Sequence, residues 1–368
     1  MVWALHCGDI FLQEKRLTER QRSICRSEGK SEKYCRYSIF RSESFVPRGG
    51  PKLRGSFGEF AFAKFSSGCR SCERHGRKEM EYDMTRISAY LQKIQDRRPV
   101  VQCITNIVTV NDCANALLAI GASPTMAHHP LEMEDFAKIC DALVCNMGAT
   151  ESLDAMGKAV IEAGRRGHPV VVDPVGCAGS PFRRKQCVQL LRTAPVSCIR
   201  GNAAEIRALA EDCNTGRGVD DREPGGQNSG PASFSETVEA AENRPAAASS
   251  GERAIVESVE RDIAKLARQT GAVVIATGAV DRIGDGERIL KVGGGTPMLA
   301  KITGSGCMLS AMLGAVMAVD RSAESAAACC AMMKSCGEQA DRWTREAGRG
   351  TGTFHMALMD ALSLILAS

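Results

Sequence analysis

The chain has 368 residues, of which 44% are hydrophobic and 24% are charged, a composition typical of a folded protein rather than a disordered or fibrous one. Its formal net charge of +4 comes from residues 1–80, where 17 Lys and Arg residues stand against 9 Asp and Glu residues. The rest of the chain is mildly acidic and only 5% of all residues are aromatic, so no nucleic-acid partner is expected. No apolar run reaches the roughly 18 residues of a membrane-spanning helix, so no membrane partner is expected either.

The sequence divides into an extension and one domain. Residues 1–85 show no sustained helical or strand periodicity and are rich in Arg, Ser, Gly and Glu, which favours a poorly ordered basic extension or leader. Residues 86–368 are expected to form the folded domain, with a low-complexity insertion at about residues 221–252, where Gly, Pro, Ser and Ala predominate. Acidic residues in the extension are unusual for a transit peptide, so we expect a cytoplasmic protein, or an organellar one if the extension is a targeting leader.

From Pro99 onward, short β-branched runs alternate with segments of helical periodicity. The clearest helix lies within residues 254–271, which are amphipathic and end at Gly271. This alternation predicts a parallel sheet with helices on both faces, an α/β fold. Strands are expected within residues 99–110, 141–148, 169–172, 198–202 and 272–278, with helices between them at residues 111–122, 156–166 and 203–210.

Polar residues gather where these expected strands end. In an open parallel sheet the ligand lies at the carboxyl ends of the strands, so their shared location indicates a binding site there. The residues in question are Asn106, Asn146 with Gly148, Asp173, Asn202 with Glu205, and Thr277.

A second signal is a Gly-Ser-Gly turn, Gly304, Ser305 and Gly306, directly before a helix of small residues. Such a turn exposes backbone N–H groups at a helix N-terminus, where they stabilise a phosphoryl group in flight. An ordinary Gly-rich turn is the alternative. Cys307 follows the turn, and a helix N-terminus lowers a thiol pKa, so this thiol is a candidate to accept a hydroxyl proton; the alternative is a buried structural cysteine.

Two of these motifs are specific enough to indicate a family. The sequence Thr-Gly-Ser-Gly-Cys at 303–307 resembles the anion-hole signature of ribokinase-like kinases, and its Cys, where most relatives have Asp, resembles hydroxyethylthiazole kinases. Asn202-Ala203-Ala204-Glu205 resembles the Asn-x-x-Glu motif that holds Mg²⁺ near the phosphates in that superfamily. A helix cap with a capping-box Glu is the alternative for this motif. The similarity runs from about Pro99 to the C-terminus, interrupted by the insertion.

The resemblance implies a ribokinase-like three-layer α/β/α fold and ATP-dependent phosphorylation of 5-(2-hydroxyethyl)-4-methylthiazole for thiamine biosynthesis or salvage. It implies a homotrimer with sites at subunit interfaces, where Met126 serves a neighbouring pocket. On the residues alone, a methionine such as Met126 is more often a core side chain, and Asp173 before Pro174 is equally a turn cap. The implied roles are substrate contact for Asn106, Met126, Gly148 and Gly304; ATP contact for Arg200, Asn202 and Thr277; Mg²⁺ binding for Asp173 and Glu205; and catalysis for Gly304, Ser305, Gly306 and Cys307.

The chain departs from the family pattern in three places. Gln102 stands where the family often has His, Gly-Gly-Gly-Thr at 293–296 replaces Asn-Gly-His, and the segment after Gly148 is two residues short. One alternative is a kinase for another vitamin precursor, hydroxymethylpyrimidine or pyridoxal, but Cys307 in place of Asp argues against it. The other is a catalytically silent thiazole- or nucleotide-binding protein, which would not need a complete phosphate and metal apparatus.

Overall fold

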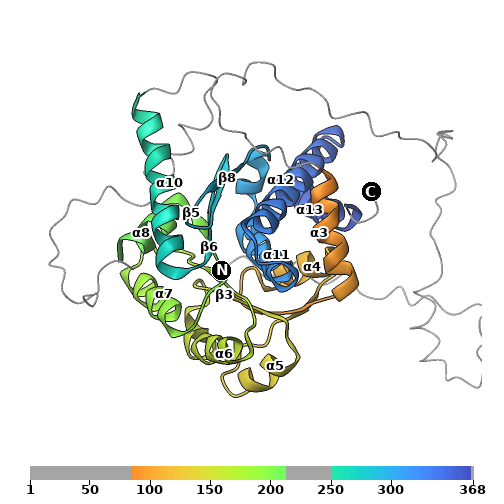
Figure 1. The fold of residues 1–368 in the computed structure, drawn as a ribbon. Helices are drawn as coiled ribbons and strands as arrows, with labels where there is room; N and C mark the ends of the chain where they lie inside the picture. The colour runs from red at the N-terminus through yellow and green to blue at the C-terminus, as the bar shows by residue number, and fades with distance from the viewer. Residues whose placement is uncertain (1–83, 213–249, 366–368) are drawn as a thin grey trace, which may run out of the picture. The chain divides into compact units, whose positions relative to one another are not determined.

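The computed structural model describes residues 84–212 and 250–365 (Figure 1). The expected basic extension and nearly all of the expected insertion lie outside the described residues, so the division of the chain stays a prediction. Within the described residues, none of the helices is long and apolar enough to cross a membrane.

The centre of the fold is an eight-stranded sheet in the order β2-β1-β3-β4-β5-β6-β7-β8. The strands from β2 to β6 in this order are parallel, and β7 and β8 are antiparallel additions at one edge. The expected mostly parallel sheet is therefore confirmed. The bounds are β1 Val100–Ile104, β2 Ser123–Thr125, β3 Ala142–Asn146, β4 Val170–Asp173, β5 Cys198–Asn202, β6 Val273–Thr277, β7 Asp281–Gly284 and β8 Ile289–Val292.

One expected strand is shorter than its β-branched run. Strand β1 ends at Ile104, and the N–H of Thr109 bonds to the carbonyl of Asn106 at 3.1 Å, so the chain turns before the next helix. Ile107 and Val108 lie in this turn and are 85% and 66% exposed. The β-branched side chains continue past the edge of the sheet, where no neighbouring strand in the described chain buries them.

Helices cover both faces of the sheet (Figure 1). Side chains alternate along each strand, so Val144 of β3 packs into one core while Leu143 and Cys145 pack into the other. The first core holds α3 (Met84–Arg97), α4 (Val110–Ala119), α11 (Ser305–Val319), α12 (Ala323–Glu346) and α13 (Thr351–Leu364). The second holds α5 (Met133–Ile139), α6 (Leu153–Arg166), α7 (Pro181–Thr193), α8 (Ala203–Asp212) and α10 (Ser250–Thr270), and two 3₁₀ turns lie at Thr150–Ser152 and Pro297–Lys301.

The helix ends follow local sequence signals. Ser180 begins α7 because its side-chain oxygen accepts a hydrogen bond from the N–H of Arg183, and Pro181 occupies the first helical position. Helix α6 ends at Gly167, which has a positive φ of 67°. The amphipathic helix expected within residues 254–271 is confirmed as α10, with Gly271 directly after it.

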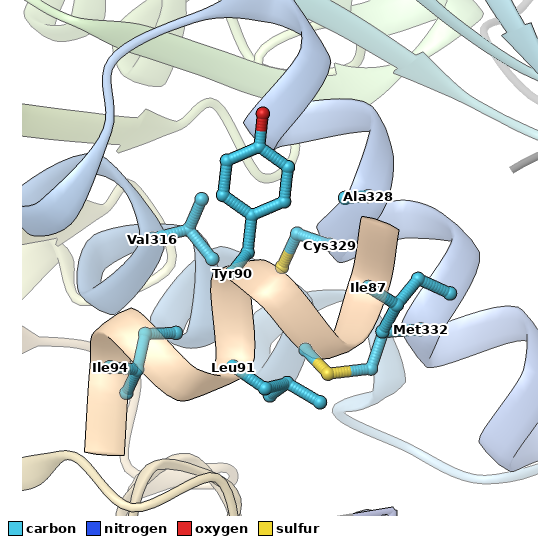
Figure 2. A pocket seen from close by; sticks show the side chains of 8 residues that line it. All are labelled: Ile87, Tyr90, Leu91, Ile94, Val316, Ala328, Cys329 and Met332. Atoms are coloured by element: carbon cyan, nitrogen blue, oxygen red, sulfur yellow. The ribbon is translucent and has the colours of Figure 1, made fainter. Parts of the chain in front are cut away.

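Helix α3 is held by an apolar contact with the two longest helices of its face. Ile87, Leu91 and Ile94 are all at most 3% exposed and lie three or four residues apart, so they share one side of the helix. They face α11 and α12, which border a small apolar crevice (Figure 2). The side chains that line it are Ile87, Tyr90, Leu91, Ile94, Val316, Ala328, Cys329 and Met332.

Candidate active site

The register of the sheet brings the polar strand ends together. Strand β3 pairs with β4 so that Asn146 lies beside Asp173, and β5 pairs with β6 so that Asn202 lies beside Thr277. Because parallel strands end at one edge, these residues line the same side of the sheet as the N-terminus of α11, which contacts β1, β3, β4 and β5.

The turn before α11 requires glycine for two reasons. Gly304 has a φ of +86°, and a β-carbon there would lie 2.8 Å from Cγ2 of Thr109. The first helical hydrogen bond runs from the N–H of Met308 to the carbonyl of Gly304 at 2.8 Å. The N–H groups of Ser305, Gly306 and Cys307 therefore have no acceptor within the helix. This is the arrangement expected of an anion site.

Arg200 brings a positive charge to the same turn. A β-carbon at Gly306 would collide with the guanidinium group of Arg200 and lie 2.8 Å from Nη2. Nη2 of Arg200 donates a hydrogen bond to Oγ1 of Thr277 at 2.8 Å, and Nη1 lies 3.7 Å from Oδ2 of Asp173. The N-terminal amides of α11 and the Arg200 guanidinium thus meet at one point, and both favour a bound phosphate group.

Two amides hold the thiol at the start of α11. Nδ2 of Asn146 lies 3.2 Å from Sγ of Cys307, and Nδ2 of Asn106 lies 3.4 Å from the same sulfur. Oδ1 of Asn146 accepts a hydrogen bond from the N–H of Gly148 at 2.8 Å, and a β-carbon at Gly148 would lie 2.7 Å from this oxygen. The structure therefore brings together the expected residues Asn106, Gly148 and Cys307.

Asp173 is fully buried among these groups. Its Oδ2 accepts hydrogen bonds from Oγ of Ser310 at 2.7 Å and Nδ2 of Asn146 at 3.2 Å. Burial raises the pKa of Asp173, and the nearby Arg200 charge and the Ser310 hydrogen bond oppose this only in part. Its Oδ1 is buried with no hydrogen-bond partner among the described residues, which leaves one carboxylate oxygen free to bind a cation.

The Asn-x-x-Glu motif forms a reciprocal helix cap. Oδ1 of Asn202 accepts the N–H of Glu205 and Oε2 of Glu205 accepts the N–H of Asn202, each at 2.9 Å. Oε1 of Glu205 also accepts the N–H of Gly176 at 2.8 Å. Burial and then the Asp173 charge raise the pKa of Glu205, despite these backbone hydrogen bonds. The capping interpretation is therefore confirmed for the described chain, and the metal role stays a prediction.

The electrostatics of Cys307 differ from the sequence-based expectation. Among the described cysteines, Cys307 is the one that is not buried, which agrees with a thiol that faces a ligand. Burial and then the Asp173 charge nevertheless raise the pKa of Cys307, and hydrogen bonds from Thr109, Asn106 and Asn146 offset this only in part. The expected lowering of its pKa by the helix N-terminus is wrong because the thiol is largely desolvated beside a buried carboxyl group.

Met126 and Gln102 lie to one side of this cluster. Met126 follows β2 and packs against the first core, and none of the described hydrogen bonds joins its side chain to Cys307 or Asn106. Gln102 is buried, and its Nε2 donates to the carbonyl of Ala127 at 3.1 Å and to Sδ of Met133 at 3.3 Å. The residue that departs from the family pattern therefore fixes the chain next to Met126.

Two contributors to the site, Ser310 and Thr109, are not predicted from the sequence. Asn146 is predicted at the strand ends that form the site, and the structure adds that it bonds both Cys307 and Asp173. Ser310 lies three residues after Cys307 and so on the same side of α11, a spacing that was available as a signal. Thr109, which contacts Gly304, gave no signal in the sequence.

Known proteins match the chain over most of its length. The model of the hydroxyethylthiazole kinase family matches residues 91–256 and 238–368. A hydroxyethylthiazole kinase from Escherichia coli O81 (strain ED1a) is 38% identical over 275 residues, which are 74% of this chain and 91% of the relative. One from Clostridium beijerinckii is 37% identical over 284 residues, 76% of this chain and 92% of the relative.

A solved structure supports the same assignment. The structure of the hydroxyethylthiazole kinase protein from Pyrococcus horikoshii OT3 has a TM-score of 0.59 and 32% sequence identity, and the match covers 75% of this chain and 92% of that chain. The three-layer α/β/α fold with a mostly parallel sheet that the sequence predicts is thus confirmed. Together, the family model, the curated relatives and the solved structure show that the chain belongs to the hydroxyethylthiazole kinase family.

Proposed function

We propose that this protein transfers the γ-phosphoryl group of ATP to the hydroxyl of 5-(2-hydroxyethyl)-4-methylthiazole, a step of thiamine biosynthesis or salvage. The names of its relatives support this substrate. The observation that carries the proposal is the contact of the Arg200 guanidinium with Gly306 in the first turn of α11. It places a fixed positive charge beside free backbone N–H groups, where phosphoryl transfer needs stabilisation of the moving charge.

Arg200 and Thr277 form the nucleotide side of the proposed site. The hydroxyl of Thr277 accepts from Arg200 and donates to the carbonyl of Gly201 at 3.2 Å, so the side chain is fixed at the end of β6. Asn202 is the neighbour of Thr277 in the sheet. The three residues would hold the ATP phosphates, while the free N–H groups of Ser305, Gly306 and Cys307 would stabilise the phosphoryl group as it moves.

The alcohol side is formed by Asn106, Gly148 and Cys307. A small thiazole alcohol that reached Cys307 would place its hydroxyl near two fixed amide groups. Because the transition state of phosphoryl transfer is loose, the hydroxyl proton leaves late and no strong base is needed. Cys307, whose pKa is raised, is therefore suited to orient the hydroxyl as a neutral thiol, and the hydroxyl proton can pass late to an oxygen of the transferred phosphoryl group.

Asp173 and Glu205 are the candidate ligands of Mg²⁺. Asp173 has a buried oxygen without a partner among the described residues, and Oε1 of Glu205 accepts the N–H of Gly176, three residues after Asp173. This fits an ion that binds one or two carboxylates together with phosphates and waters. The described residues hold no cluster of three or more His, Cys, Asp or Glu side chains, so the bound nucleotide would complete the site. When bound, Mg²⁺ would neutralise charge on the phosphates.

A homotrimer with sites at subunit interfaces is part of the proposal. Ile107 and Val108 are large, exposed and directly follow Asn106, so a neighbouring subunit placed there would cover apolar surface beside the substrate. Met126 would then reach a neighbour's pocket. Sedimentation velocity tests this: an Ile107→Asp variant that dissociates supports the trimer, and a monomeric unaltered protein contradicts it. A cytoplasmic or organellar location stays a prediction.

The activity is tested by ADP release from the purified full-length chain with MgATP and one of three alcohols. Among the three alcohols, the thiazole alcohol is expected to turn over fastest, because Cys307 rather than Asp follows the Gly304–Gly306 turn. Faster turnover of hydroxymethylpyrimidine or pyridoxal would overturn the substrate. Calorimetric binding of the thiazole alcohol with no ADP release from any substrate would show a silent binding protein instead.

A further inference from the structure

Lys334 of α12 is a buried cation that the proposed mechanism does not use. Its side chain is 9% exposed, and Nζ donates to the carbonyl oxygens of Gly278 at 3.0 Å, Ala279 at 2.9 Å and Gly294 at 3.2 Å. Oδ1 of Asp281 lies 3.5 Å from Nζ. An ammonium group has three N–H donors and no acceptor, so three carbonyls satisfy it completely and Asp281 balances its charge.

The group that Lys334 holds adjoins the nucleotide side of the site. Gly278 directly follows Thr277, the residue that accepts the hydrogen bond from Arg200. The carbonyl of Gly278 accepts from Lys334, and its N–H donates to Oδ1 of Asp281 at 3.0 Å. Both polar groups of this residue are therefore fixed, and the direction in which the chain leaves Thr277 is fixed with them.

The same helix also holds the Gly-rich loop at 293–296. Oε1 of Glu338 accepts the N–H of Gly295 at 2.7 Å, and Oδ2 of Asp341 accepts the hydroxyl of Thr296 at 2.7 Å. Lys334, Glu338 and Asp341 are four and then three residues apart, so they form one row along α12. Gly295 has a φ of +92°, and a β-carbon there would lie 3.1 Å from Cγ of Lys334, so glycine lets the loop lie on the lysine stem.

We propose that Lys334 is a positioning residue for phosphoryl transfer: its ammonium group joins the turn after Thr277 to the Gly-rich loop and so keeps Thr277 and Arg200 in place to bind the ATP phosphates. The inference rests on the proposed function and deepens it. The proposal also accounts for the Gly-Gly-Gly-Thr sequence at 293–296. The carbonyl of Gly294 accepts from Lys334, and the absence of a side chain at Gly295 lets the loop pack against the stem of Lys334.

The test is to change Lys334→Ala in the full-length chain and to measure both substrates separately. The KM for ATP is expected to rise about tenfold to 100-fold, as for loss of a supporting contact, while the KM for the thiazole alcohol stays unchanged. The shortened side chain leaves three carbonyls and one carboxylate around an empty space. Added ammonium ions are therefore expected to restore ATP affinity, whereas tetramethylammonium ions, which cannot donate hydrogen bonds, are not.

Calorimetry with a non-hydrolysable ATP analogue separates this inference from the proposed activity, because it needs no acceptor alcohol. If the unaltered chain binds the analogue but phosphorylates none of the alcohols, the proposed function fails, while weaker and ammonium-sensitive binding by Lys334→Ala still supports the role of Lys334. Lys158→Met is the matched control, since this exposed lysine of α6 pairs with Asp154, which is not a residue of the proposed site. Its nucleotide affinity is expected to stay unchanged.

Removing Lys334 alone leaves Asp281 buried without its partner and endangers folding. The double variant Lys334→Met/Asp281→Asn removes both charges and retains an oxygen for the N–H of Gly278. It is expected to fold and to bind the analogue as weakly as Lys334→Ala. The proposal would be overturned if either folded variant bound the analogue as tightly as the unaltered chain. It would also be overturned if the KM values for ATP and the thiazole alcohol rose equally, or if ammonium did not restore ATP affinity in a folded Lys334→Ala variant. Failure of both variants to fold would do so too, by showing that Lys334 serves stability alone.

Discussion

Gly306 lies directly against the guanidinium group of Arg200, so that a β-carbon at position 306 would be 2.8 Å from Nη2. Arg200 is only 14% exposed and is also tied to Thr277 and Asp173. The absence of a side chain at Gly306 thus lets a fixed charge reach the first turn of α11. Gly306 is needed because Arg200 approaches it closely, whereas Gly304 is needed because its backbone φ is positive.

Gly306→Ala is therefore expected to damage activity without unfolding the protein. The added methyl group meets the far end of a side chain, which moves, and Ala favours the helix by about 1 kcal/mol over Gly. The displaced guanidinium no longer meets the phosphates, and misplacement by about 1 Å costs about 10²-fold. Steady-state kinetics should show the loss in kcat/KM for ATP, with an unchanged or raised melting temperature.

Gly157→Ala is the matched control for that prediction. Gly157 also lies within a helix, α6, but a β-carbon there would meet nothing within 4 Å. This variant is expected to gain about 0.5–1 kcal/mol in the free energy of unfolding and to keep full activity. Full activity in Gly306→Ala would show that Arg200 does not need its present place.

Much of the fold was predictable because buried parallel strands have a simple sequence pattern. Val170–Asp173 and Val273–Thr277 are continuous apolar runs that end in a polar residue. The first extends one residue beyond the expected strand at 169–172, and the second falls inside the expected strand at 272–278. The turn at Gly304 to Gly306 was predictable as well, since these residues directly precede a helix of small residues. Local signals therefore identified the elements and the turn that begins α11, and its phosphate role stays a prediction.

Contacts between distant segments were not predictable in the same way. Lys334 is 56 residues from Gly278, and Asn146 is 161 residues from Cys307, so no spacing in the sequence connects them. The direction of the Cys307 pKa shift was missed for a related reason: a helix N-terminus is a local feature, whereas burial beside Asp173 depends on the whole sheet. Long-range packing decides both.

Asn146→Ala is expected to affect the chemical step more than nucleotide binding. Asn146 bonds Cys307, Asp173 and Gly148, but none of its described hydrogen bonds reaches Arg200 or Thr277. Loss of this second contact of the thiol should lower kcat about tenfold to 100-fold, with little change in KM for ATP. The free energy of unfolding should fall by about 1–3 kcal/mol, because buried partners lose a hydrogen bond.

The comparison for this variant is Thr277→Val, which removes the hydroxyl that accepts from Arg200. It should raise the KM for ATP and leave the KM for the thiazole alcohol unchanged. If the two variants gave the same pattern of losses, the division of the site into an alcohol side and a nucleotide side would be wrong.

The raised pKa of Cys307 predicts the pH dependence of the reaction. Its thiolate becomes populated only above the ordinary thiol pKa of 9.0, so at neutral pH the group is a neutral thiol. Activity should therefore show no ionisation of Cys307 below pH 9, and any thiolate-dependent gain in kcat should appear as the pH rises above that value. Cys307→Ser should lower kcat by about 100-fold or less, no more than the smallest usual contribution of a general base, because the neutral thiol only orients the hydroxyl. The neutral state of Cys307 would be contradicted if kcat of the unaltered protein changed with an ionisation near pH 7 and Cys307→Ser abolished that change.

Asp173→Asn is expected to stabilise the protein and to lower its kcat. Burial raises the pKa of Asp173 above its ordinary value of 3.8, so the folded protein holds the proton more tightly than the unfolded chain does. The stability associated with the protonated form is present below pH 3.8 and is lost as the pH rises through the folded-state pKa. At pH 7 the native carboxylate therefore imposes a cost that an amide avoids, while its oxygen still accepts from Ser310 and Asn146.

Urea denaturation of both proteins at several pH values measures this difference. The advantage of Asp173→Asn in the free energy of unfolding should be present at pH 7 and should shrink as the pH falls toward 3.8. Its kcat should fall about 10²-fold, because the buried oxygen that is free to bind a cation is gone. Ser310→Ala serves as the control, since it weakens the hydrogen bonding of Asp173 without removing the charge. A less stable Asp173→Asn at pH 7 would mean that attraction to Arg200 outweighs the cost of burial.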